Sequence, residues 1–162
     1  MRLRISVVFF EGVDVRRVAN GMGRDPRIGR AFLDAGLGFG GPCLPKDLRA
    51  LVMGAQRKGI RMRLAEAVLL SNEIQPLRAV HLAHRIIGNL RGKKAAVLGL
   101  AFKAGTSDMR EAPSVKLVHA LLREAMHVTV YDPEAMQDAS AYFGKKVEYA
   151  GLLLRRDRVG HL

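Results

Sequence analysis

The sequence of 162 residues has only one cysteine, no long hydrophobic run and no glycine-rich dinucleotide fingerprint. A single cysteine, Cys43, excludes an internal disulfide and a cysteine-based metal cluster. The longest apolar runs fall far short of the roughly 20 residues that a transmembrane helix needs, so we expect no membrane partner. The apolar run near the N-terminus ends at Glu11 instead of a small-residue cleavage site, which argues against a signal peptide. The predicted location is therefore the cytoplasm.

Acidic residues are also scarce, with 15 against 27 basic ones and a formal net charge of +12. Such an excess raises the question of a polyanionic partner. The basic residues are scattered, however, with neither an aromatic-interleaved basic strip nor helix-turn-helix spacing. We therefore expect no nucleic-acid partner, and an anionic small molecule explains the charge at least as well. A basic nucleic-acid-binding protein remains an alternative that rests on charge alone.

The first half of the chain predicts helices separated by a long loop. The first ten residues are an apolar and basic stretch that suits a strand or the end of a helix. His81 and His84 lie three residues apart on a predicted helix without a third ligand, so we expect no metal site. The other expected elements are a short amphipathic helix from Val13 to about Gly23, a loop with a helical turn near residues 28–33, a helix from Pro45 to Gly59, and a longer helix from about Met62 to Gly88 that Pro76 kinks or divides.

The second half predicts a parallel sheet. An apolar strand over residues 95–100, a helix over residues 113–124 and a second strand over residues 127–133 form a βαβ unit. Residues 145–150 predict a third strand. The segment after this third strand has no partner element. A sheet of so few strands would expose apolar edges, so we expect the C-terminal sheet to be cut short.

The only cysteine lies in residues 38–51, GFGGPCLPKDLRAL, between a glycine cluster and the start of a helix. At a helix N-terminus the unpaired N–H groups and the helix dipole favour a thiolate, and Lys46 adds positive charge. The glycines allow close approach of a ligand to the backbone. A reactive nucleophile is one interpretation of Cys43, and a buried cysteine acting as a small hydrophobe is the other. Asp47 is a candidate general base, or simply a charge that complements the dipole.

The loop over residues 99–111 follows the first predicted strand. Parallel sheets bind ligands at the carboxyl ends of their strands, so this loop is a candidate binding site. It lacks the G-x-G-x-x-G spacing of a dinucleotide fingerprint. Lys103 and Arg110 are two cations suited to a phosphate or pyrophosphate. The alternative is that both are solvated surface charges.

Several stretches resemble the UDP-glucose/GDP-mannose dehydrogenase family, namely DVRRVANGMGRDPRIGRAFLDAGLGFGGPCLPKDLRAL, SNEIQ, KKAAVLGLAFKAGTSDMREAPSVKLVHALL and VTVYDPEAM. The resemblance runs from about Val13 to Tyr149. It implies an α/β protein with a helical central domain over residues 1–60 and a connecting helix over residues 61–90. Residues 91–162 would form a truncated, Rossmann-like parallel-sheet domain that binds the UDP-sugar.

The resemblance implies an NAD-dependent oxidation of the C6 alcohol of a nucleotide sugar to the uronic acid. UDP-glucose is favoured over GDP-mannose as the substrate. It makes Cys43 the nucleophile that forms the thiohemiacetal and thioester. Asp47 would assist water activation, and Lys46 and Arg110 would bind the cofactor. The implied substrate-binding residues are Arg27, Asp34, Ala35, Gly36, Leu37, Gly38, Phe39, Gly40, Phe102 and Lys103.

The departures from the family pattern concern what the chain does not contain. An N-terminal Rossmann domain is missing, as is the segment that supplies the family's catalytic Lys and Asn, and Pro42 stands where the family usually has Ser. We therefore expect a fragment that needs a separate NAD-domain chain and forms a homo-oligomer through the long helix. The alternative is a non-catalytic remnant that binds nucleotide sugar or only oligomerises.

Overall fold

The computed structural model describes residues 13–151, and contacts divide the chain into two units, residues 1–37 and 38–162. The strand or helix end expected in the first ten residues lies outside the described part, as does the segment after residue 151. The two-unit division comes from contacts alone, and the boundaries near residues 60 and 90 that the resemblance implies stay a prediction.

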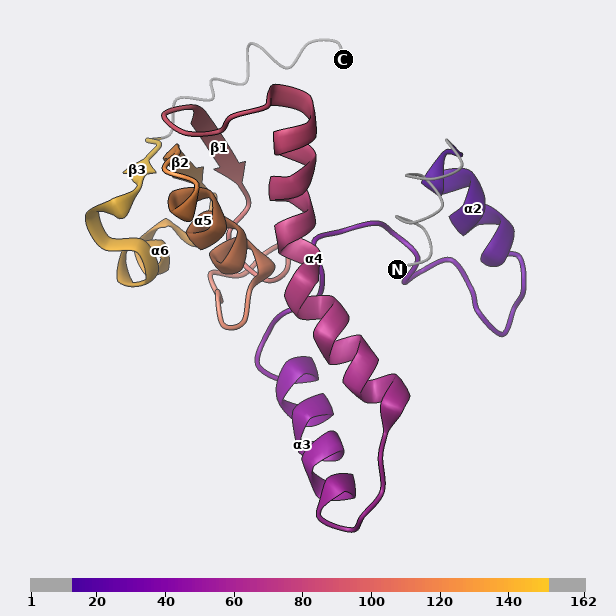
Figure 1. Cartoon of the computed structure of the whole chain (residues 1–162). Coiled ribbons are helices and arrows are strands. Elements are labelled where there is room, and N and C mark those ends of the chain that lie inside the picture. The colour runs from indigo at the N-terminus through magenta and orange to yellow at the C-terminus, as the bar shows by residue number, and fades with distance from the viewer. Residues whose placement is uncertain (1–12, 152–162) are drawn as a thin grey trace. The chain divides into compact units, whose positions relative to one another are not determined.

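The N-terminal unit contains α2 (Val15–Met22), the short helix that the sequence predicts (Figure 1). Asp14 caps its start, because its carboxylate accepts a hydrogen bond from Arg16 N at 2.8 Å. The prediction of a helical turn near residues 28–33 is wrong. Two separate turns stand there, one closed on the carbonyl of Asp25 and one on that of Arg30. Gly29 lies between them with φ of 66°, and this left-handed conformation interrupts a right-handed helix.

The C-terminal unit begins with two helices, α3 (Leu44–Gln56) and α4 (Arg63–Ile87), whose chain directions reverse in a helical hairpin (Figure 1). Helix α3 starts one residue before the predicted Pro45, because proline fits the first turn, where no N–H donor is needed. Helix α4 is a single element of 25 residues. Pro76 is buried and lies inside this continuous helix, which it therefore does not divide.

A three-stranded parallel sheet follows, in the order β1 (Lys94–Leu98), β2 (His127–Tyr131), β3 (Glu148–Tyr149). Lys94 pairs with His127 and Leu98 with Tyr131, and α5 (Pro113–Arg123) forms the crossover. The predicted α/β class, the βαβ unit and the third strand are confirmed. The sequence interpretation missed α6 (Met136–Phe143) and the 3-10 turn η1 (Gly144–Lys146). The sequence signal for α6 was an apolar residue every three or four positions, and two of these residues, Ala139 and Phe143, are buried.

The buried core of the C-terminal unit lies between the sheet and α5. Leu117, Val118 and Leu121 are buried on α5, and Val128 and Val130 are buried on β2. This side of α5 therefore packs against the sheet. Among the described residues, no helix is both long enough and apolar enough to cross a membrane.

Candidate functional site

Cys43 is the N-cap residue of α3 and is exposed to solvent. Its exposure rules out the interpretation of a buried core cysteine. Asp47 N donates a hydrogen bond to Cys43 O at 2.9 Å, the first bond of the helix. Lys46 and Asp47 are also exposed, and the Lys46 Nζ atom lies 3.3 Å from Asp47 Oδ1. The predicted nucleophile, general base and cation are thus within one accessible helical turn.

Residues 38–41, here called the glycine loop, lie directly against the loop between β1 and α5. Gly41 N donates a hydrogen bond to Arg110 O at 2.9 Å. A Cβ atom on Gly40 would lie 2.4 Å from Glu111 O, and one on Gly41 would lie 2.7 Å from the ring of Phe102. Gly41 also has φ of 86°, a conformation that side chains disfavour. The structure therefore brings Gly40 and Cys43 together with Phe102 and Arg110, which lie about sixty residues later in the sequence.

Phe102 and Lys103 occupy the start of that β1–α5 loop. Phe102 is half-buried, and its N–H donates to Asp108 O at 3.0 Å, which closes the loop on itself. Lys103 is exposed and its Nζ lies 5.4 Å from the centroid of the Phe102 ring, a cation–π distance. An aromatic face with an accessible cation beside it suits a base or sugar with an attached phosphate.

Arg110 is held by a neighbouring carboxylate. Its Nη2 lies 2.6 Å from Asp108 Oδ2, and its Nε donates to both Asp108 oxygens at 3.0 Å. These hydrogen bonds lower the pKa of Asp108 to about 2 and raise that of Arg110. The negative charge of a Cys43 thiolate also contributes to the raised pKa of Arg110, in keeping with the backbone contact of Arg110 with Gly41, two residues before Cys43. The Arg110 side chain is 65% exposed, which leaves it accessible to an anion.

Replacing Arg110 by glutamine should raise the pKa of Asp108 from about 2 toward its ordinary value of 3.8, because the variant loses the guanidinium hydrogen bonds and the charge, while the backbone N–H of residue 110 still donates. The folded-state pKa of Asp108 is lowered, so the stabilisation from this pair is present above about pH 4 and is lost as the pH falls toward 2. Carboxyl carbon chemical shifts measured against pH give the midpoint. Arg16→Gln, which removes the similar pair with Asp14, is the control and should leave Asp108 unchanged. A wild-type midpoint near 3.8 would contradict the arrangement.

Asp132 joins the ends of β1 and β2 and was not among the predicted site residues. It is buried, and its carboxylate accepts four backbone N–H bonds, from Leu100, Ala101, Glu134 and Ala135. Burial by itself raises the pKa of Asp132, but the four donors outweigh it and the pKa lies below its ordinary value. The sequence signal was an Asp-Pro pair directly after a buried strand.

Helix α4 contributes two further residues that sequence interpretation did not single out. Asn72 forms hydrogen bonds with both backbone polar groups of Phe39, and Glu73 forms ion pairs with Arg49 of α3 and Lys116 of α5. Both lie in the SNEIQ stretch, which had served only to support the family resemblance. The available signal was an asparagine inside a helix, four residues before a proline.

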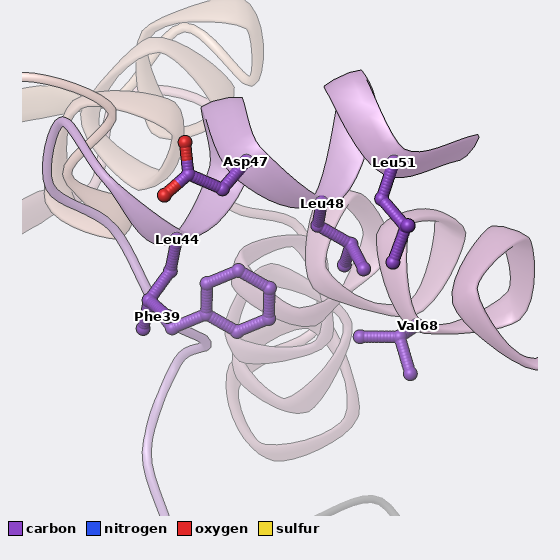
Figure 2. A pocket seen from close by; sticks show the side chains of 6 residues that line it. All are labelled: Phe39, Leu44, Asp47, Leu48, Leu51 and Val68. Atoms are coloured by element: carbon purple, nitrogen blue, oxygen red, sulfur yellow. The ribbon is translucent and has the colours of Figure 1, made fainter. Parts of the chain in front are cut away.

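An apolar groove of about 400 Å³, lined in part by the first turns of α3, opens between the glycine loop and the two helices (Figure 2). The groove residues come from the loop, α3 and α4: Phe39, Leu44, Asp47, Leu48, Leu51 and Val68. In Figure 2 the Asp47 carboxylate is turned away from Leu48, Leu51 and Val68. Leu44 and Leu51 are 63% and 52% exposed, a large apolar area for side chains on a helix surface.

The remaining predicted residues belong to the N-terminal unit. The Arg27 side chain is 87% exposed and pairs with Asp25, with Nη2 and Oδ2 2.5 Å apart. Asp34 Oδ1 accepts a hydrogen bond from Arg30 Nη2 at 2.7 Å, and Arg30 also donates to Asn20. Ala35 and Gly36 are exposed and Leu37 is half-buried. Their predicted roles toward a nucleotide sugar stay predictions.

Two family models match the chain in succession. Residues 7–74 match the central domain of the UDP-glucose/GDP-mannose dehydrogenase family, and residues 96–156 match the UDP binding domain of the same family. The first match includes Cys43 and the glycine loop, and the second includes Phe102, Lys103 and Arg110.

Curated proteins and solved structures agree with these matches. UDP-glucose 6-dehydrogenase TuaD of Bacillus subtilis is 46% identical over 138 residues, which cover 85% of this chain and 30% of the relative. UDP-glucose 6-dehydrogenase of Pseudomonas aeruginosa is 43% identical and covers 88% of this chain and 32% of the relative. A UDP-glucose dehydrogenase structure from Pyrobaculum islandicum superimposes with a TM-score of 0.82 at 44% identity, covering 86% of this chain and 32% of that one. The chain thus spans about a third of the length of these relatives.

Proposed function

Because the chain belongs to the UDP-glucose/GDP-mannose dehydrogenase family, we propose that it supplies the nucleophile and the UDP-sugar site of an NAD-dependent nucleotide-sugar dehydrogenase. The observation that carries the proposal is the hydrogen bond of Gly41 to Arg110 with the close contacts beside it, which hold the Cys43 loop against the β1–α5 loop. A nucleophile and a phosphate-binding loop in such contact can act on the same substrate molecule.

In this proposal, Cys43 retains the sugar while its C6 carbon is oxidised from alcohol to carboxylate. Loss of a hydride and of the hydroxyl proton first converts the C6 alcohol to an aldehyde. The thiolate then adds to the aldehyde carbon, forming a C–S bond and a thiohemiacetal whose oxygen takes up a proton. Loss of a hydride and that proton converts the thiohemiacetal to a thioester. Asp47 removes a proton from a water molecule that attacks the thioester carbon, and the C–S bond breaks to release the uronate and regenerate the thiolate.

NAD, when bound, accepts the hydride in each of the two oxidations. The residues of this chain fit only part of its binding site. Arg110 and Lys46 are exposed cations on the two segments that lie in contact, and they suit the cofactor's negative or polar groups, whereas the chain has no glycine-rich fingerprint for the pyrophosphate. We therefore propose that a separate NAD-domain chain binds most of the cofactor.

For the substrate, the proposal assigns the uridine and phosphates to Phe102 and Lys103. Phe102 offers an aromatic face and Lys103 an exposed ammonium group. The loop from Asp34 to Gly40 would enclose the sugar, and Arg27 would reach the sugar nucleotide of a neighbouring subunit. UDP-glucose is proposed over GDP-mannose because the two curated relatives described above are UDP-glucose 6-dehydrogenases.

A homo-oligomer formed through α4 is part of the proposal, as is a cytoplasmic location. Helix α4 exposes large apolar side chains along its length, among them Leu64 at 82%, Leu70 at 61% and Ile86 at 73%. Exposed apolar area on this scale favours burial against another protein surface.

The test is binding of UDP-glucose to this chain by titration calorimetry, followed by NADH formation after addition of a separately expressed NAD domain. We expect binding that weakens about tenfold in Lys103→Ala, because a charge-assisted contact to phosphate is lost. Cys43→Ala should bind UDP-glucose and form no uronate. Binding without turnover in the wild-type mixture would favour the non-catalytic remnant instead. No binding to any nucleotide sugar would leave only a role in oligomerisation.

A further inference from the structure

The glycine loop is attached to α4 by one side chain. Phe39 N donates a hydrogen bond to Asn72 Oδ1 at 2.7 Å, and Asn72 Nδ2 donates one to Phe39 O at 2.8 Å. Asn72 thus satisfies both polar backbone groups of one loop residue. Two hydrogen bonds, to the N–H and to the C=O of the same residue, determine the orientation of the Phe39 backbone, which a single bond cannot do.

The attachment needs two special residues nearby. Gly38 has φ of 118°, and a Cβ atom there would lie 2.6 Å from Asn72 Oδ1, so only glycine fits. Pro76 stands four residues after Asn72 in α4 and has no N–H to donate to the Asn72 carbonyl. The same Cβ position on Gly38 is 3.5 Å from that carbonyl oxygen, so the loop approaches the helix where its backbone ladder is interrupted.

The next residue, Glu73, links α4 to the other elements of the site. Lys116 Nζ of α5 lies 2.7 Å from both Glu73 oxygens, and Arg49 Nη2 of α3 lies 3.8 Å from Glu73 Oε1. Arg49 in turn forms two hydrogen bonds of 3.0 Å with the carboxylate of Glu111. Exposed ion pairs are individually weak, but a two-point arginine contact within a network sets geometry more firmly.

We propose that Asn72 and Glu73 are positioning residues that hold Cys43 in one place beside Arg110 and Phe102. Asn72 attaches the loop that precedes Cys43 to α4. Glu73 joins α4 to α3, which follows Cys43, and to α5, which follows Arg110. Neither residue contributes to the groove beside Cys43, and both act through the backbone that carries the thiol. The chemical role of Cys43 rests on the proposed function, whereas its placement rests on these contacts.

The first experiment measures hydrogen exchange of the Phe39 amide in the wild type and in Asn72→Ala. Loss of both hydrogen bonds should speed exchange about tenfold. Ser71→Ala is the matched control: Ser71 is the preceding residue on α4, and its hydroxyl bonds only within the helix, to Ala67 O. Exchange in Ser71→Ala should equal that of the wild type. Thermal unfolding of each variant shows whether the fold is retained.

The second experiment uses the fact that Cys43 is the only cysteine. Alkylation rates are compared for iodoacetate, which is negative, and iodoacetamide, which is neutral. A thiol held near Arg110 favours the anion, so the rate ratio in the wild type should exceed that in the urea-unfolded chain. Asn72→Ala should lower the ratio about twofold toward the unfolded value, and Glu73→Gln should lower it less, because loss of the Glu73 charge by itself favours the anionic reagent. Because unfolding also lowers the ratio, the rates are compared only under conditions in which thermal unfolding shows each variant to be fully folded.

These outcomes separate the inference from the proposed function, because neither reagent requires a nucleotide sugar. Faster Phe39 exchange with a lowered ratio supports the positioning role even where UDP-glucose fails to bind. Unchanged exchange and an unchanged ratio in folded Asn72→Ala overturn it, even where the reconstituted enzyme turns over. Glu73→Gln replaces an exposed side chain by one of the same shape, so it tests the inference should Asn72→Ala unfold.

Discussion

Replacing Gly40 by alanine should separate the Cys43 loop from the β1–α5 loop. The new Cβ would lie 2.4 Å from Glu111 O and 3.0 Å from Ala112 Cα. Both atoms belong to the backbone, so no side-chain rotation relieves the overlap. Glu111 itself has φ of 53°, a strained conformation for a residue with a side chain, and has little freedom to move. Overpacking of this kind costs about 1–3 kcal/mol, enough to break the neighbouring bond of Gly41 to Arg110.

The measurements for Gly40→Ala are urea unfolding, exchange of the Gly41 amide and UDP-glucose affinity. We expect lower stability, loss of Gly41 protection and loss of measurable binding. Gly54→Ala in α3 is the control, because no atom lies within 4 Å of the added Cβ there. It should leave binding unchanged and raise stability by roughly 0.5–1 kcal/mol, since alanine favours a helix over glycine. Wild-type Gly41 protection in Gly40→Ala would contradict the described contact between the loops.

Replacing Asp132 by alanine should destabilise the C-terminal unit by about 3 kcal/mol or more, a large share of the 5–15 kcal/mol typical of a whole domain. Four backbone N–H groups, at 2.6 to 3.1 Å from the carboxylate, would lose their acceptor, two of them in buried and two in partly buried positions. Two of them, Leu100 and Ala101, begin the loop that carries Phe102 and Lys103. The variant should therefore lose the binding loop together with the junction of β1 and β2.

Urea unfolding against pH tests the role of Asp132. Its folded pKa is lowered, so its stabilising effect is present above the unfolded value of about 3.9 and is lost as the pH falls below it. The wild type should lose this contribution on acidification, whereas Asp132→Ala should lack it at every pH. Asp138→Ala, an exposed aspartate in the first turn of α6, should change stability by no more than about 0.5 kcal/mol. Equal effects at positions 132 and 138 would refute the argument.

Much of the fold followed from local patterns. The ends of α2, α3 and α4 were predicted to within three residues, because glycine and proline act on the backbone at their own positions. The parallel βαβ unit followed from two apolar strands on either side of an amphipathic helix. Helix α6 was missed because it is short and, unlike α2, has no capping side chain at its start. The helical turn near residues 28–33 was wrongly predicted because Gly29 adopts a left-handed conformation there.

For the site, the sequence by itself determined which side chains are available. It placed the only thiol at the start of a helix, after a glycine cluster, and two cations in the loop after the first strand. Helix starts and loops can be predicted in this way because they depend on residues that are neighbours in the sequence. Only the tertiary structure decided that these two segments are in contact, and that Asn72, Glu73 and Asp132 hold them. Hydrogen bonds between residues 30 or more positions apart depend on how the chain folds back on itself, which no local pattern records.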